Sequence, residues 1–191
     1  QALAMLDEHD LRRVSPSVTA HLVRGSRGEE AETPQPDDEL LVRTRHRVVA
    51  NNALAVEAAT RTLLDLGFRV EAVRRDVQGD AADVGTQLGE RVREMAQDGK
   101  TERRAVVIGG ETTVRVGDAA GKGGRNQEMA LAAATQISGL QRAAVMTFAT
   151  DGVDGPTDAA GAIATGRTAR EASRSGPTGT TVNDVAVGLT L

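Results

Sequence analysis

The chain has 191 residues, of which 39% are hydrophobic and 26% are charged, so it can bury the core of one large or two small globular domains. Its net charge of −4, with basic residues scattered among acidic ones, gives no field that would attract nucleic acid. The absence of cysteine excludes disulfides, thiolate metal sites and cysteine nucleophiles. With no signal peptide and no apolar run of about twenty residues, we expect a cytoplasmic protein without nucleic-acid or membrane partners.

Alternating helices and strands are predicted along residues 1–100. Apolar spacing predicts an amphipathic helix over residues 1–11, and the polar tract 25–39 is typical of a surface connection. Residues 47–50 indicate a short strand. The amides of Asn51 and Asn52 suit the start of a helix that runs to residue 66, and Gly67 suits its end.

The pattern continues with a strand over 68–73, a helix over 81–95 and a strand over 105–108. Strands that alternate with helices predict a parallel sheet covered on both faces. The polar gap at residues 97–100 suggests a boundary, so we assign residues 1–100 to a first α/β unit.

A smaller unit of mixed α/β structure is predicted over residues 101–191. A strand over 112–116 directly follows the strand over 105–108, which favours a bend or hairpin at 109–111 rather than a helical crossover. A Gly-rich turn, an Ala-rich helix over 129–137 and a strand over 143–148 come next. The expected fold class is therefore α/β in two units.

The Gly-rich turn at residues 121–128 lies directly before a predicted helix. Glycines such as Gly123 and Gly124 let the backbone approach a ligand, and Lys122 and Arg125 add positive charge. The first turn of a helix also presents unpaired N–H groups at the positive end of its dipole, which suits phosphate or carboxylate. The alternative is a tight connection without a ligand.

Three carboxylates follow the strand over 143–148, namely Asp151, Asp154 and Asp158, with Thr157 between the last two. Strand ends are where open α/β sheets place ligands, and oxygen-rich clusters suit Mg²⁺ carried with a nucleotide. The alternative is that Asp151 and Asp154 stabilise turns while Asp158 caps a short helix at 159–160.

A third polar loop, residues 176–184, again combines glycine with hydroxyl and amide groups, contributed by Thr178, Gly179, Thr180 and Asn183. Glu111 follows two glycines at a strand end, where it could serve a ligand or simply a turn. Cations, donors and carboxylates in one small domain are what phosphoryl transfer requires, because that reaction depends on positioning and charge stabilisation.

Four ordered motifs carry a resemblance to a known family: residues 109–114, the Gly-Gly-Arg-Asn-Gln-Glu motif at 123–128, residues 150–161 and residues 176–184. They resemble the C-terminal MOFRL domain of type 2 glycerate kinases. The upstream part, including residues 52–59, is similar to the later half of that family's N-terminal Rossmann-like domain.

The resemblance implies ATP- and Mg²⁺-dependent phosphorylation of D-glycerate in a cleft between two domains, with 2-phosphoglycerate the favoured product. It implies that Arg125 binds the transferring phosphoryl group or the glycerate carboxylate, because its planar fork binds such anions bidentately. Lys122 would add charge, Asn126 and Glu128 would fix the loop or contact substrate, and Asp151 and Asp154 would bind Mg²⁺ or substrate hydroxyls. A homo-oligomer remains open.

The chain departs from this family in two places. The N-terminal region that supplies the family's catalytic lysine has no counterpart before Gln1, so we expect an incomplete cleft. The family's segment between residues 164 and 176 is longer, helical and aromatic, whereas here residues 165–175 are short and polar. Two alternatives to kinase activity stay open: a hydroxypyruvate reductase, which lacks an identifiable dinucleotide fingerprint here, and a non-catalytic anion-binding fragment.

Overall fold

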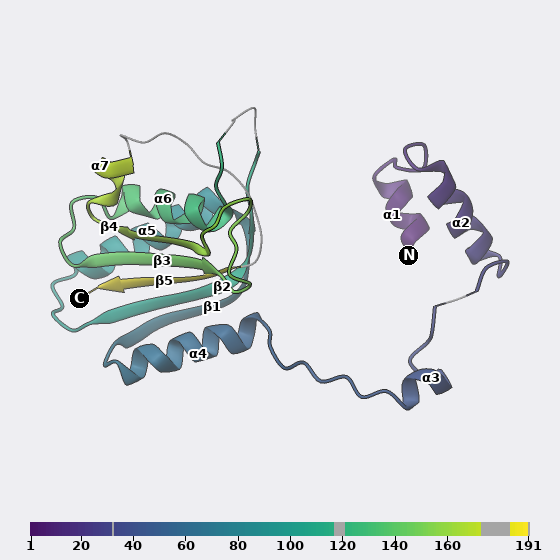
Figure 1. Ribbon diagram of the computed structural model, residues 1–191, viewed down its shortest axis with the longest axis horizontal. Helices are drawn as coiled ribbons and strands as arrows, with labels where there is room; N and C mark the ends of the chain where they lie inside the picture. The colour runs from purple at the N-terminus through teal and green to yellow at the C-terminus, as the bar shows by residue number, and fades with distance from the viewer. Residues whose placement is uncertain (32, 117–120, 173–183, 191) are drawn as a thin grey trace. The chain divides into compact units, whose positions relative to one another are not determined.

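A computed structural model describes residues 1–31, 33–116, 121–172 and 184–190 (Figure 1). The chain forms two compact units, Gln1–Val48 and Val49–Leu191. No helix in the described part of the chain combines the length and the apolar character that crossing a membrane requires.

The first unit contains three helices: α1 (Ala2–Glu8), α2 (Pro16–Ser26) and α3 (Glu39–Val42). The first helix ends earlier than predicted, because Asp10 adopts a positive φ of 50° that no helix accommodates. The second helix was not predicted; its start is marked by Ser15 and by Pro16, whose fixed φ suits a first helical turn. The strand predicted over 47–50 is wrong, since these residues pair with no other segment that the structure describes.

The second unit is built on a five-stranded mixed sheet in the order β1-β2-β5-β3-β4. Its strands are β1 (Arg69–Asp80), β2 (Arg104–Thr113), β3 (Ala143–Ala149), β4 (Gly161–Thr165) and β5 (Asp184–Thr190). Strands β1 and β2 are parallel, while β5 is antiparallel to both β2 and β3, and β4 is antiparallel to β3. The predicted α/β class is confirmed, with a mixed sheet in place of a purely parallel one.

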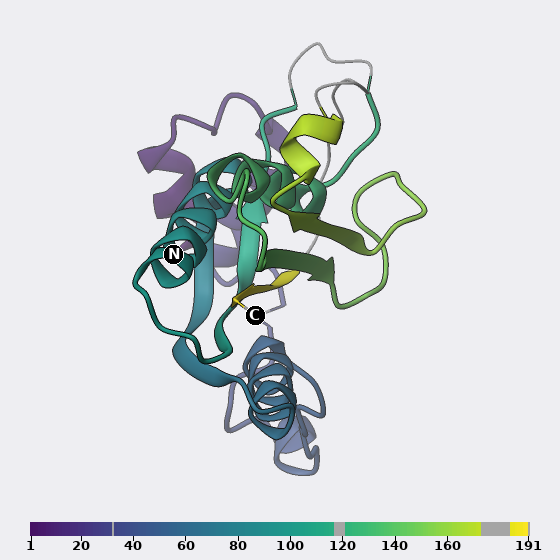
Figure 2. The ribbon, with the colours of Figure 1, turned by 90° about the vertical axis from the view of Figure 1, so that its left-hand side faces the viewer.

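Helices cover both faces of this sheet, as predicted. Figures 1 and 2 show α5 (Ala81–Gln97) and α6 (Arg125–Gln136) on one face and α4 (Asn52–Asp65) on the other. The α5–α6 side holds the larger core, with Leu88, Met129 and Val145 among its buried residues. The α4 side holds a smaller core that includes Val56 and Phe68.

The ends of α4 follow the sequence prediction closely. The Asn51 side chain accepts a hydrogen bond from the backbone N–H of Leu54 at 2.9 Å, which caps the first turn. Gly67 follows the helix with a φ of +79°, a conformation that only glycine adopts without strain.

Strand β2 passes straight through Gly109 and Gly110, so the predicted bend at 109–111 is wrong. The glycines serve close packing instead of a turn. A Cβ on Gly110 would lie 2.0 Å from the Val77 carbonyl oxygen of β1, and one on Gly109 would lie 2.3 Å from the Val56 side chain of α4. Both positions let neighbouring elements approach the strand.

Residues 97–100 contain the end of α5 and the start of the connection to β2, inside the second compact unit, whereas the division between units falls at Val48 and Val49. Assignment of residues 1–100 and 101–191 to two domains of the family therefore stays a prediction. Short helix α7 (Thr168–Ala172) follows β4, and the partly buried Ala169 packs against the larger core.

Candidate functional site

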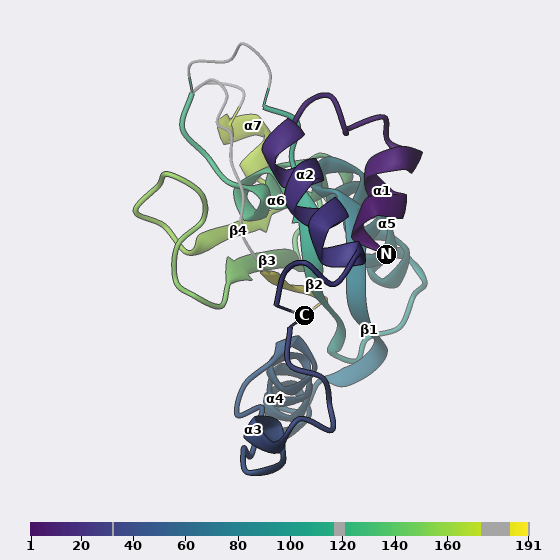
Figure 3. The ribbon, with the colours of Figure 1, turned by 90° about the vertical axis from the view of Figure 1, so that its right-hand side faces the viewer.

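Most of the predicted site residues gather at one edge of the sheet. Because β5 is antiparallel to both β2 and β3, these two strands run in the same direction, and β1 runs parallel to β2. The C-terminal ends of β1, β2 and β3 therefore share an edge, and α5 begins there directly after β1. This edge is where open α/β sheets place ligands. The loop between β3 and β4 projects there (Figure 3).

The N-terminus of α6 is capped by a carboxylate that lies 28 residues further along the chain. Asp154 accepts hydrogen bonds from the backbone N–H of Asn126 at 3.1 Å and of Gln127 at 2.9 Å. It also accepts one from Asn126 Nδ2 at 3.1 Å. The first amides of the helix, which were expected to hold a ligand anion, are thus occupied by the protein's own anion.

Gly124 is the residue that makes this contact fit. It occupies the N-cap position of α6, and a Cβ there would lie 2.0 Å from Asp154 Cγ. Contacts this short do not occur, so any other side chain would displace the carboxylate. The Gly-rich motif was predicted to let the backbone come close to a ligand. In the structure, the group that comes close to Gly124 is the Asp154 carboxylate.

Thr157 forms a second link between the β3–β4 loop and α6. Its Oγ1 donates to the Asp154 carbonyl oxygen at 2.6 Å and accepts from Gln127 Nε2 at 3.0 Å. The Asp154 backbone N–H donates to the Ala159 carbonyl oxygen at 2.7 Å. Residues 159–160 form no helix, so the predicted capping of such a helix by Asp158 is wrong.

The first two residues of α6 are buried. Arg125 is 2% exposed, and its Nη1 lies 3.8 Å from Oε1 of Glu111, which follows Gly110 in β2. Asn126 is fully buried, and its carbonyl oxygen accepts a hydrogen bond from the buried Thr147 hydroxyl of β3 at 2.7 Å. The structure thus places the exposed Glu111 carboxylate beside the buried Arg125 guanidinium, while their roles toward a ligand stay a prediction.

A second acidic group at this edge was missed by the sequence analysis. Asp80, the last residue of β1, caps α5 by accepting from the Ala82 backbone N–H at 3.0 Å, and lies 3.7 Å from Arg115 Nε. Burial of Glu128, together with the nearby Asp80 carboxylate, raises the pKa of Glu128 above its usual range. The only sequence signal for Asp80 was an aspartate directly before a predicted helix.

Two of the other predicted residues lie at the surface. Lys122 and Asp151 are exposed, and Asp151 accepts a hydrogen bond from the Val153 backbone N–H at 3.2 Å in a local turn. Gly123 is buried beside Gly124. The predicted residues Thr178, Gly179, Thr180 and Asn183 lie outside the described residues.

The side chains at this edge are poorly suited to hold a metal ion by themselves. Within residues 1–31, 33–116, 121–172 and 184–190, no three His, Cys, Asp or Glu side chains gather so that they could hold one. Asp154 already accepts three hydrogen bonds as a helix cap, which argues against its predicted role as a metal ligand. The role of Asp151 toward Mg²⁺ stays a prediction.

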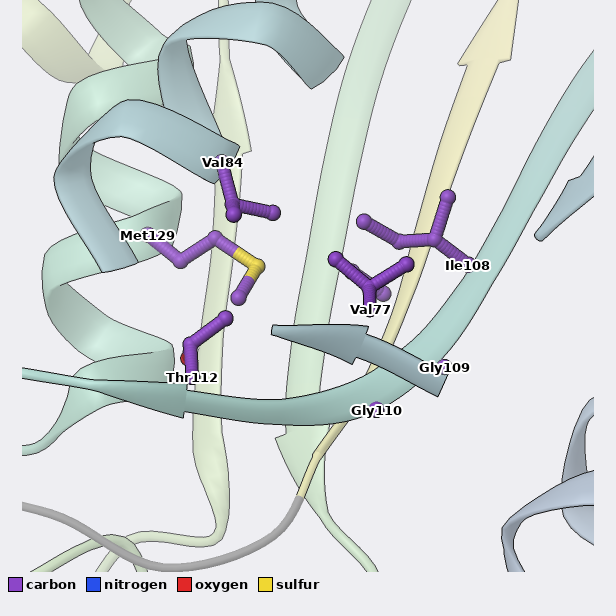
Figure 4. Close-up of a pocket in the computed structure, with 8 residues that line it drawn as sticks. Val77, Val84, Ile108, Gly109, Gly110, Thr112 and Met129 are labelled. Atoms are coloured by element: carbon purple, nitrogen blue, oxygen red, sulfur yellow. The ribbon is translucent and has the colours of Figure 1, made fainter. Parts of the chain in front are cut away.

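A small cavity lies behind this edge, between α5, α6 and the sheet. Figure 4 shows the side chains of Val77, Val84, Ile108 and Met129 directed toward it. Its volume of about 10 Å³ is at the lower limit for one water molecule, and its lining is almost wholly apolar. It is a packing defect and not a substrate site.

Comparison with known proteins agrees with this arrangement. A model of the MOFRL family matches residues 104–182. Over residues 104–182, the chain belongs to the MOFRL family. This segment contains β2, α6, β3 and the loops that meet at the site.

Similarity to glycerate kinases extends over almost the whole chain. A glycerate 2-kinase from Pyrococcus horikoshii is 36% identical and matches 98% of the chain and 48% of its own length. The crystal structure of a glycerate kinase from Thermotoga maritima superposes with a TM-score of 0.68 at 28% identity, over 90% of this chain and 50% of that one. The chain thus spans about half the length of these relatives.

A third relative carries another name. A putative hydroxypyruvate reductase from Agrobacterium vitis is 33% identical and matches 77% of the chain and 32% of its own length.

Proposed function

We propose that the chain forms one wall of the phosphoryl-transfer site of a glycerate kinase. The reaction would move the terminal phosphoryl group of ATP to D-glycerate, with 2-phosphoglycerate as the favoured product. The observation that supports this most strongly is the fixed position of Arg125, at the start of α6 and at the ligand-binding edge of the sheet, within the MOFRL segment.

Arg125 would bind the transferring phosphoryl group or the glycerate carboxylate. A planar guanidinium can donate two parallel hydrogen bonds to either anion, and a desolvated site strengthens them. In this structure the side chain is buried, and its Nη1 lies 3.8 Å from Oε1 of Glu111, so contact with substrate requires the guanidinium to become accessible. Glu111 would contribute negative charge beside Arg125 before substrate binds.

The remaining cations and donors would hold the nucleotide. Since Asp154 occupies the first amides of α6, the phosphates would be held by side chains such as exposed Lys122. Thr157 and Asn126 would support the loop, and Glu128 with its raised pKa would face the substrate. Mg²⁺ would arrive with the nucleotide phosphates, as it commonly does.

The test is release of ADP that depends on both D-glycerate and Mg²⁺, followed by phosphorus NMR of the product. It should use two proteins: this chain alone, and this chain joined to the segment of the Pyrococcus horikoshii kinase that it does not match. We expect turnover by the joined protein and none by the chain alone. No turnover by the joined protein, when the P. horikoshii kinase is active in the same assay, would refute the proposal.

A second candidate function is reduction of hydroxypyruvate, favoured only by the name of the Agrobacterium vitis relative. Oxidation of NADH that depends on hydroxypyruvate would support it. A third is anion binding without chemistry, which calorimetry would reveal as nucleotide or glycerate binding without ADP release by the joined protein.

Cytoplasmic location and a homo-oligomeric state stay predictions.

A further inference from the structure

Asp154 is a buried carboxylate neutralised by a helix end. Its exposed fraction is 0%, and among the described residues no Lys, Arg or His side chain pairs with it. Its partners are the two backbone amides and one side-chain amide at the start of α6. The positive end of the helix dipole therefore stabilises the charge that burial would otherwise disfavour.

This contact replaces the local cap that α6 lacks. The N-cap residue Gly124 has no side chain to accept from the first amides, so the helix start depends on a group from the loop after β3. Thr157 and Gln127 link the same loop to the same turn. As a result, the backbone directly after Arg125 is held by residues that are far away in sequence.

We infer that Asp154 is a positioning residue: it fixes the first turn of α6, and through it the direction of Arg125, and it occupies the place where this helix would otherwise bind an anion. Its action on catalysis rests on the proposed function. Its occupation of the helix end does not. The two parts can therefore be tested separately.

The first test needs no enzyme activity. Hydrogen exchange followed by NMR should compare the chain with its Asp154→Asn variant, which keeps the size of the side chain and removes its charge. We expect the amides of Asn126 and Gln127 to exchange about ten- to a hundredfold faster, because each loses a charge-assisted bond. The amide of Ile137, at the far end of α6, should be unchanged. Unchanged exchange at 126 and 127 would overturn the inference.

Inorganic phosphate provides the second probe. In the unmodified chain we expect no phosphate-dependent shift of the Asn126 and Gln127 amide signals, since Asp154 fills the position. In Asp154→Asn the helix end has lost its anion, and phosphate should shift both signals. Phosphate-dependent shifts in the unmodified chain would show that Asp154 does not occupy this position. Asp65→Asn, an exposed change on α4, is the matched control and should behave as the unmodified chain does.

The third test uses the active joined protein and a double-mutant cycle. If Asp154 acts through Arg125, then Asp154→Asn should lower kcat in the Arg125 protein but not in an Arg125→Ala background. Multiplicative losses would contradict the positioning role, because a general loss of structure would add to the loss of the arginine. Full activity of Arg125→Ala would count against the proposed role of Arg125 while leaving the exchange and phosphate results valid.

Discussion

Gly124→Ala should lower the free energy of unfolding of the second unit, although it adds only one carbon atom. The new Cβ would lie 2.0 Å from Asp154 Cγ, and ordinary contact begins at 3.4 Å, so the carboxylate must retreat by about 1.4 Å. That distance exceeds the tolerance of its hydrogen bonds to Asn126 and Gln127, which measure 2.9–3.1 Å.

The magnitude follows from those bonds. A hydrogen bond to a charged group contributes about 1.5–3 kcal/mol, and three are disturbed, but the displaced carboxylate recovers part of this from water or new partners. We expect the free energy of unfolding to fall by about 3 kcal/mol, within the range of overpacked cores.

Urea unfolding followed by far-UV circular dichroism measures this change. Gly25→Ala is the matched control, since Gly25 lies in α2 with no atom within 4 Å of an added Cβ and belongs to the other compact unit. It should leave the transition of the second unit unchanged. A loss below about 1 kcal/mol for Gly124→Ala would refute the reasoning, because the cap would then tolerate displacement.

Further outcomes are expected for changes at Arg125, Arg104 and Asp80. Arg125→Ala in the joined protein should lower kcat/KM for D-glycerate about a hundredfold or more. Arg125→Lys should recover little of this loss, because lysine lacks the planar guanidinium. The surface change Arg61→Ala is the control and should leave kcat/KM unchanged. Arg104→Met should reduce the free energy of unfolding by about 3 kcal/mol, since Arg104 is buried and bridges Glu71 and Asp98. Arg104 holds the pKa of Asp98 below its usual range, so the stability that this ion pair contributes is present at neutral pH and declines as the pH falls below about 4. The urea midpoints at pH 7 and pH 3 should therefore differ less in Arg104→Met than in the unmodified chain. Glu128 should titrate by carbon NMR above its usual pKa, and Asp80→Asn should lower that pKa; an ordinary value in the unmodified chain would contradict the burial seen here.

Much of the second unit could be predicted from local sequence signals. The apolar run over residues 129–137, the asparagine before α4 and the glycine after it each predict an element from neighbouring residues, so their meaning hardly depends on distant ones. Helix α6 nevertheless begins at Arg125, four residues before its predicted start. The strands over residues 69–80, 104–113 and 143–149 were found for the same reason, although β1 and β2 extend beyond their predicted ends.

The errors occur where a neighbour in space changes the meaning of a residue. Gly109 and Gly110 suggest a turn, yet they lie inside β2. The lack of a side chain at these two positions leaves room for Val56 and Val77 of the adjacent elements. The segment 47–50 has the composition of a strand but finds no partner in the described structure. Asp80 was overlooked because its relation to Glu128 depends on β1 and α6 meeting at one edge.

The sequence by itself determined the kind of protein: an α/β chain with a Gly-rich, cationic turn before a helix and an acidic loop after a strand, with the motifs of the MOFRL family. Only the tertiary structure decided how those two features are used. A carboxylate 28 residues away fills the end of α6, so the turn that suggested a place for a ligand's anion holds Asp154 instead. Hydrogen bonds and dipoles act over a few ångströms, and which groups come that close depends on the packing of the whole sheet.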